Sequence, residues 1–314
     1  MQEAQTTLLP VSNKKRKRMT REGIYGTAFG LLPILNTVLF TLVPLVISLV
    51  TMFVHMDGYH FDSMRWAGFD NFVTVFHDAR FFKSLGVSAY LILAHMIGLV
   101  LSLGTSVVLS QKLKGSKFFT TLFFIPYICA SVAVAVMWRQ MFDYNGGIIN
   151  TILKAFGSKD GIDWMNDPAA FTPMLIIVIA WQAPGYGIVM FTAALTGVNS
   201  ALYEAARIDG AGRWKQFTAI TMPAISPTTF YLFLMGLING FMTFDIARIF
   251  TGDSWAGTAG PSDMGLTSTL YIYYQGVQFR NMPIASVMSF ILGLIVMTVM
   301  IIYYALADRL VNYD

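Results

Sequence analysis

The chain has 314 residues, of which 55% are hydrophobic and only 12% are charged, whereas soluble domains carry about 25% charged residues. The net charge of +4 would suit a nucleic-acid partner, but the basic run 14–18 and Arg21 supply more than this excess. Basic flanks of membrane proteins are topology signals, so we expect membrane lipid and no nucleic acid around this chain.

Six charge-free windows are long enough to cross a hydrocarbon core of about 30 Å. They cover 24–54, 84–110, 118–138, a segment within 172–197, 224–244 and 283–307. The apolar runs are continuous rather than alternating, which excludes barrel strands, and only helices otherwise satisfy their own backbone in lipid. We therefore predict an all-α integral membrane protein with six transmembrane helices. The first window is about twice as long as a signal-peptide core and lacks a small-residue cleavage site, so we expect a retained span.

The distribution of Lys and Arg predicts the orientation, because these residues accumulate in cytoplasmic segments. With the N-terminus inside, more than half of them lie on the inner side, in the N-terminal segment, in 111–117 and in 204–223. We therefore expect a multi-pass protein with both termini in the cytoplasm. Its parts would be a basic tail, 1–21, and a six-span domain, 22–314, with a cytoplasmic loop at 198–223.

The segment 204–223, EAARIDGAGRWKQFTAITMP, interrupts the apolar sequence with charged and small residues. Asn199 or Ser200 can cap a short helix, and Gly210 and Gly212 would end it, since glycine costs about 1 kcal/mol inside a helix. A second short helix would follow, and Pro223 is suited to open the next span. The segment therefore predicts two short helices joined by an elbow.

Two interpretations of this elbow remain open from the residues alone. The alanines of the segment, Ala205, Ala206 and Ala211, would leave one face flat enough for another protein's backbone to approach. An amphipathic connector that lies on the membrane surface fits the same residues.

Chemistry of other classes is absent from the sequence. It contains no G-x-x-x-x-G-K-[ST] for ATP phosphates, no H-E-x-x-H and no Cys/His cluster, so we expect no catalysis, no metal and no cofactor bound by this chain. An intramembrane serine protease based on Ser262 would need a later histidine, and all four histidines precede it. A stand-alone channel or secondary carrier for a small polar solute remains the alternative.

Polar and small residues within two spans could line a path for a polar solute. Gln182 and Tyr186 lie four residues apart in the fourth span, and Asn239 and Thr243 do so in the fifth, near Gly236 and Gly240. A site for a polar solute needs hydrogen-bonding groups beside flat or small surfaces. Small and amide residues also hold transmembrane helices together, so a packing role is equally open. The lack of buried cationic side chains favours a neutral solute over a phosphorylated one.

The charged segment resembles the cytoplasmic signature of permease subunits of binding-protein-dependent ABC importers, namely E-A-A, three residues, G, nine residues, I, one residue and P. The matching positions are Glu204, Ala205, Ala206, Gly210, Ile220 and Pro223, with Met222 in place of the usual leucine. LYEAARIDGAGRWKQFTAITMPAISPT is similar to the carbohydrate-uptake branch, the maltose and glycerol-3-phosphate permease relatives. Segments 66–85, 123–153 and 268–292 resemble the first of the two permease subunits of such systems.

The resemblance implies a type I ABC importer permease fold and a transport function. The loop would be a coupling helix that enters a cleft in a cytoplasmic ATPase, with contacts from Glu204, Ala205, Ala206, Asp209, Gly210, Ile220 and Pro223. ATP and Mg would be held by partner subunits, and spans four and five would line the path. The implied partners are a second homologous permease, two ATPase subunits, an extracytoplasmic solute-binding protein and a saccharide. The implied location is a bacterial inner or plasma membrane.

Overall fold

The computed structural model describes residues 21–111, 114–252 and 257–307. The chain divides into two compact units, Met1–Val50 and Thr51–Asp314.

The first unit is one long helical rod. It consists of α1 (Arg21–Thr37), a π-helical turn η1 (Val38–Leu42) and most of α2 (Val43–Thr51). The π turn follows Pro33, which has no N–H to donate, and the Thr37 hydroxyl donates to the Pro33 carbonyl at 3.0 Å. The stretch Phe29–Thr51 is long and apolar enough to cross a membrane.

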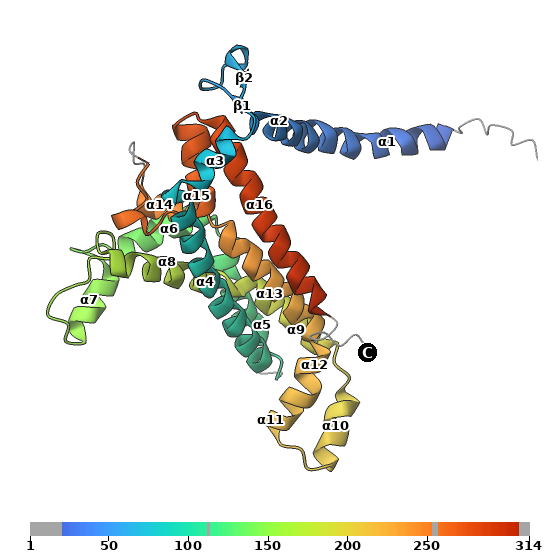
Figure 1. Ribbon diagram of the computed structural model, residues 1–314. Helices are drawn as coiled ribbons and strands as arrows, with labels where there is room; N and C mark the ends of the chain where they lie inside the picture. Colours follow the sequence, from blue (N-terminus) through green and yellow to red (C-terminus); the bar gives the residue numbers. More distant parts are fainter. Residues whose placement is uncertain (1–20, 112–113, 253–256, 308–314) are drawn as a thin grey trace, which may run out of the picture. The chain divides into compact units, whose positions relative to one another are not determined.

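The second unit is a helical bundle with a small hairpin at one end (Figure 1). Its elements from the hairpin to the middle of the chain are β1 (Val54–His55), the 3-10 turn η2 (Phe61–Ser63), β2 (Arg65–Trp66), α3 (Asp70–Phe76), α4 (Ala79–Leu109), α5 (Ser116–Ile128), α6 (Ser131–Met141), α7 (Ile148–Ala155), α8 (Pro168–Gln182) and α9 (Pro184–Thr196). The remaining elements are α10 (Ser200–Ile208), α11 (Arg213–Gln216), the π turn η3 (Phe217–Thr221), α12 (Met222–Ala224), α13 (Ser226–Phe241), α14 (Asp245–Thr251), the 3-10 turn η4 (Pro261–Asp263), α15 (Ser268–Tyr273), the π turn η5 (Tyr274–Gln278) and α16 (Met282–Ala305).

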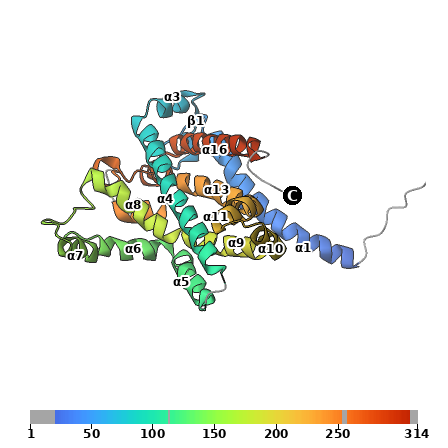
Figure 2. The ribbon, with the colours of Figure 1, turned by 90° about the horizontal axis from the view of Figure 1, so that it is seen from below.

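Helix α4 is the centre of the bundle. It contacts α8, α9 and α13, and Figure 2 shows it passing between α8 on one side and α13 on the other. The close approach depends on a row of small side chains at four-residue spacing, which brings them to one helix face. The members of this row, all buried, are Ala94, Gly98, Ser102 and Ser106.

This row fits α9 and the end of α8 closely. A Cβ on Gly98 would lie 2.7 Å from the Ala183 Cβ, a contact that the packing does not allow. The Ser102 hydroxyl donates to the Pro184 carbonyl at 2.9 Å, and the Ser106 hydroxyl donates to the Ile188 carbonyl at 3.1 Å. Small residues that let backbones meet and serines that bond across helices are typical of membrane bundles.

The number of spans predicted from the sequence agrees with the described helices. Five are long and apolar enough to cross a membrane, and the α5–α6 pair makes a sixth if it counts as one span. The third predicted span, 118–138, is broken, because α5 and α6 meet at an angle of 95°. Pro126 cannot donate in its helix, and Cys129 and Ala130 are extended, with ψ of 140° and 127°.

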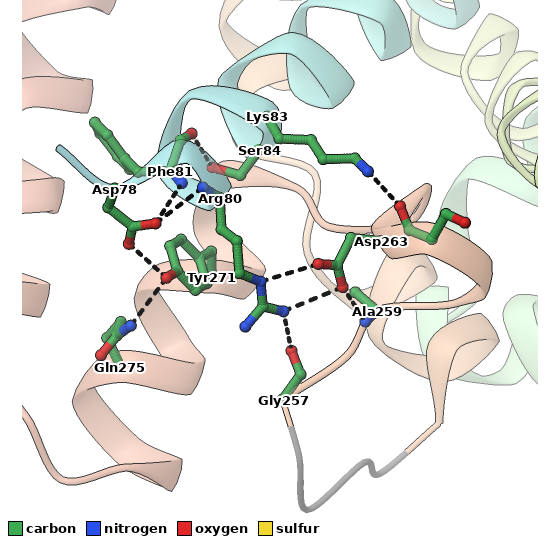
Figure 3. A network of polar contacts seen from close by, with 11 residues as sticks. Asp78, Arg80, Phe81, Lys83, Ser84, Gly257, Ala259, Asp263, Tyr271 and Gln275 are labelled. Atoms are coloured by element: carbon green, nitrogen blue, oxygen red, sulfur yellow. Dashed lines mark hydrogen bonds and ion pairs between the residues drawn. The ribbon is translucent and has the colours of Figure 1, made fainter. Parts of the chain in front are cut away.

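A polar network holds the hairpin end of α4 in place (Figure 3). The Asp78 carboxylate caps α4 by accepting from the backbone N–H groups of Arg80 and Phe81. Its other oxygen accepts from the Tyr271 hydroxyl at 2.5 Å, and Gln275 donates to that hydroxyl at 3.1 Å. The network therefore joins α4 to α15, which lies far away in the sequence.

Candidate functional site

A cavity of about 510 Å³ lies among α4, α5, α6, α8, α9, α13 and α14. Five of the six residues that the sequence suggested for a solute path line it, namely Gln182, Tyr186, Gly236, Asn239 and Thr243. The structure thus brings together side chains from two predicted spans.

The sixth residue, Gly240, lies elsewhere. It faces α4, where an added Cβ would lie 2.5 Å from Ile92 Cγ1 and 2.9 Å from its Cα. Gly236 also contacts α4, since its Cβ would meet the Met96 Cε at 2.6 Å. These two glycines permit close packing of α13 on α4, and Gly236 does so at the edge of the cavity.

Gln182 supports the break between α5 and α6. Its Nε2 donates to the carbonyls of Pro126 at 3.3 Å and Cys129 at 3.4 Å. Non-helical backbone inside a membrane needs such partners for its polar groups. The side chain therefore contributes to the shape of the cavity as well as to its lining.

Three tyrosines gather at the cavity. The rings of Tyr127 and Tyr186 stack with centroids 5.6 Å apart, and the hydroxyls of Tyr186 and Tyr231 lie 3.2 Å from each other. Tyr127 and Tyr231 were not among the residues predicted from the sequence. A signal for Tyr231 exists in the sequence, because it stands eight residues before Asn239 and therefore shares its helix face.

The cavity carries one acidic group. Among the described residues that line it, there is no lysine or arginine, and Asp245 at the start of α14 is the single acid. His95 also lines the cavity, and its Nε2 is buried without a hydrogen-bond partner in the part of the chain that the structure describes. The described residues contain no group of three His, Cys, Asp or Glu side chains that could hold a metal ion.

The predicted elbow forms at the end of the bundle that lies away from the hairpin (Figure 1). Asn199 caps α10 by accepting from the Ala201 N–H at 3.0 Å, as the sequence predicted. After Ile208 the chain reverses at Gly210, whose φ is +74°. The Ala211 N–H then donates to the Ala206 carbonyl at 2.8 Å, which closes the end of the helix.

The elbow residues divide into an exposed and an inward group. Glu204, Ala205, Asp209 and Gly210 are exposed, whereas Ala206, Ile220 and Pro223 are half-buried. Two large apolar side chains are also exposed here, Ile208 at 87% and Trp214 at 76%. Neither was predicted from the sequence to take part in docking. The exposed tip thus combines two acids, a glycine, two bulky apolar groups and three cations, Arg207, Arg213 and Lys215.

A hydrogen bond joins the two arms of the elbow. The hydroxyls of Tyr203 and Thr221 lie 2.8 Å apart and join α10 to the turn that precedes α12. The contact therefore links α10 to the segment that leads into α13. The sequence gives no direct indication of this contact.

Comparisons with known proteins agree with this geometry. Residues 24–312 match the family described as binding-protein-dependent transport system inner membrane component. A probable ABC transporter permease protein, YesP of Bacillus subtilis (strain 168), is 33% identical over 304 residues, 96% of each chain. The lactose transport system permease protein LacF of Rhizobium radiobacter is 30% identical over 86% of this chain and 90% of its own.

Other similar proteins extend the comparison. The diacetylchitobiose uptake system permease protein NgcF of Streptomyces coelicolor (strain ATCC BAA-471 / A3(2) / M145) is 33% identical over 70% of this chain and 66% of its own. A chain of a bacterial alginate ABC transporter, crystallised in complex with an alginate pentasaccharide-bound periplasmic protein, has a TM-score of 0.79 and 23% identity over 92% of this chain and 96% of its own. The chain therefore belongs to the family of inner membrane components of binding-protein-dependent transport systems, as a permease subunit with the type I ABC importer fold.

Proposed function

We propose that this chain forms half of the translocation path for a neutral saccharide or oligosaccharide in an ATP-driven importer. A second, homologous permease subunit would form the other half. An extracytoplasmic solute-binding protein would deliver the saccharide. Relatives named for lactose and diacetylchitobiose uptake support this substrate class.

The observation that carries the proposal is the tyrosine-lined cavity. Sugars present apolar ring faces and many hydroxyls, which suit flat aromatic rings beside amides and hydroxyls. Tyr127, Tyr186 and Tyr231 supply the first kind of surface, and Gln182 and Asn239 supply the second. Asp245 would repel a phosphate or a carboxylate, and no described cation of the lining would compensate, which favours a neutral substrate.

The elbow is the second part of the proposal. With both termini in the cytoplasm, the loop 198–223 would dock on one of two ATPase subunits through Glu204, Ala205, Ala206, Asp209 and Gly210. Ile220 and Pro223 would pass the movement to α13. ATP and Mg would be bound by those subunits, and this chain would carry no catalysis of its own. The basic tail, 1–21, would lie on the same side as the elbow, and the permease domain would cover 22–314.

A reconstitution tests the proposal. The permease pair, the ATPases and the cognate binding protein would be incorporated into liposomes, and uptake of a labelled neutral saccharide bound by that protein would be followed. We expect uptake that requires ATP and the ATPase subunits and that survives an uncoupler. Transport by this chain alone, or uptake that an uncoupler abolishes, would contradict the proposal in favour of a channel or secondary carrier.

A further inference from the structure

The segment between the first two spans lies at one membrane face at both of its ends. The first span ends at Thr51, and the second begins at Ala79. Thr51 is buried, and its hydroxyl lies 2.9 Å from the hydroxyl of Ser286 on α16. The hairpin and α3, which fill this segment, therefore lie beside the beginnings of two candidate spans, α4 and α16.

Helix α3 has three distinct faces. Asn71 and Val75 are buried, and the Asn71 side chain donates to the carbonyls of Met52 and Val54 at 2.9 Å each. Asp70, Thr74 and His77 are exposed and polar. These residues fix which side of α3 faces the protein and which side can face water.

The third face is apolar and uncovered in this chain. Its residues are Phe69, Val73 and Phe76, with exposed fractions of 68%, 55% and 56%. Their spacing of four and three residues places them in one stripe along the helix. The stripe lies between the buried face and the polar face, so α3 exposes apolar side chains next to its polar ones.

The hairpin extends the stripe. Trp66 is 78% exposed, and its ring stacks on Phe53 with centroids 6.0 Å apart. Phe53 also contacts the edge of the Phe69 ring at 5.5 Å. The four exposed residues Trp66, Phe69, Val73 and Phe76 form one surface, which we call the aromatic stripe.

We propose that the aromatic stripe inserts into the headgroup boundary of the lipid leaflet at this face and anchors the start of α4. Only His77 and Asp78 separate α3 from α4, so α3 lies next to the first turn of that helix. In the first turn of α4, Phe82 is also exposed, at 50%, and it adds an apolar ring close to the end of α3. Tryptophan and other aromatic residues favour this zone, and a helix with adjoining apolar and polar faces lies in its plane.

Spin labels on neighbouring faces of α3 test the inference. Cys129, the only cysteine, would be replaced by Ser, and nitroxides would be attached to Val73→Cys and Phe76→Cys. The matched controls on the same helix are Asp70→Cys and Thr74→Cys. The assembled transporter would be placed in bilayers of phosphatidylethanolamine and phosphatidylglycerol. Collision rates would be measured with oxygen and with a water-soluble nickel chelate.

We expect the logarithm of the ratio of oxygen to nickel collision rates to be positive at positions 73 and 76 and negative at positions 70 and 74. A negative value at all four positions would overturn the inference, because the stripe would then face water. Protection of positions 73 and 76 from both reagents would also overturn it, because a protein partner would then cover the stripe. Immobilisation of these labels on addition of the binding protein would also overturn the inference, because that protein would then cover the stripe. The measurement does not require transport, so it is independent of the proposed substrate.

Discussion

Arg80 and Asp263 form a bidentate ion pair, in which the Arg80 Nε and Nη2 donate to the two carboxylate oxygens at 2.9 and 3.1 Å (Figure 3). The two residues are 183 positions apart in the sequence and join the start of α4 to the turn before α15. Arg80 also donates to the Gly257 carbonyl at 2.7 Å, and the neighbouring Lys83 donates to the Ser262 carbonyl. Asp263 and Ser262 both have positive φ, so α4 holds a turn that costs backbone energy.

The first prediction concerns this ion pair. Arg80→Ala should lower the free energy of unfolding by about 2 kcal/mol, because a half-buried carboxylate loses its charged donors. Asp263→Asn, which keeps the shape and tolerates positive φ, should cost a similar amount. The double variant should lose less free energy of unfolding than the two single variants lose together. Thermal unfolding in detergent would measure these losses. The control is Arg139→Ala, which removes an arginine that donates a hydrogen bond to the Ile249 carbonyl. Strict additivity would contradict the coupling.

The second prediction concerns Tyr271 and pH. Burial, and then the hydrogen bond to Asp78, raise the pKa of Tyr271 to about 12, from about 10 in an unfolded chain. The folded state therefore holds its proton longer than the unfolded state. The stabilisation is complete below pH 10 and is lost as the pH rises toward 12. Between pH 10 and 12, unfolding temperatures should fall more steeply for the native protein than for Tyr271→Phe. Tyr144→Phe, at an exposed position, should not change the slope, and equal slopes for native and Tyr271→Phe proteins would refute the prediction.

The third prediction tests the elbow as a docking surface. Gly210→Asp should leave the protein in the membrane but abolish ATP-dependent uptake. Aspartate tolerates positive φ, and nothing in this chain lies within 4 Å of the added Cβ, so the fold accepts it. A docked partner backbone would not accept it. Gly115→Asp, at a second glycine with positive φ on the loop before α5, should retain uptake. Normal uptake by the Gly210 variant would argue for a passive connector.

The fourth prediction separates packing from a path role for Gly240. Gly240→Ala should destabilise the protein by about 1–3 kcal/mol, because the new methyl meets the backbone of Ile92. Gly104→Ala on α4 has nothing within 4 Å and should be neutral or slightly stabilising. Thermal unfolding of both variants checks this. An unchanged stability with an altered half-saturation for uptake would instead assign Gly240 to the path.

The fifth prediction concerns the tyrosines of the cavity. Tyr186→Phe and Tyr231→Phe should each reduce saccharide uptake about 2- to 10-fold with little change in stability, which corresponds to the loss of one neutral hydrogen bond. Tyr304→Phe on α16, an exposed position, is the control. Uptake would be measured in the reconstituted importer alongside thermal unfolding. A loss of stability that matches the loss of uptake would show that these hydroxyls hold helices together and do not serve the substrate.

The sequence by itself determined the membrane class, the number of spans and the caps of the elbow. Each of these depends on neighbours along the chain: hydrocarbon thickness demands a run of apolar residues, and Asn199 and Gly210 act on backbone within a few residues. The sequence could not determine that the third span breaks after Ile128. That break persists because Gln182, a residue of another span, satisfies the carbonyls of Pro126 and Cys129.

Tertiary structure alone decided what surrounds the cavity. Tyr127, Tyr186 and Tyr231 come from three helices. Gly185 lets α5 approach α9, since a Cβ there would lie 2.6 Å from the Tyr127 Cβ, and Gly98 and Ser102 let α4 approach the same region. The tertiary structure also places Gly240 against α4 and outside the cavity, although Gly240 directly follows Asn239 along the helix. Adjacent residues on a helix point about 100° apart, so which of them faces a cavity depends on the helices packed around it.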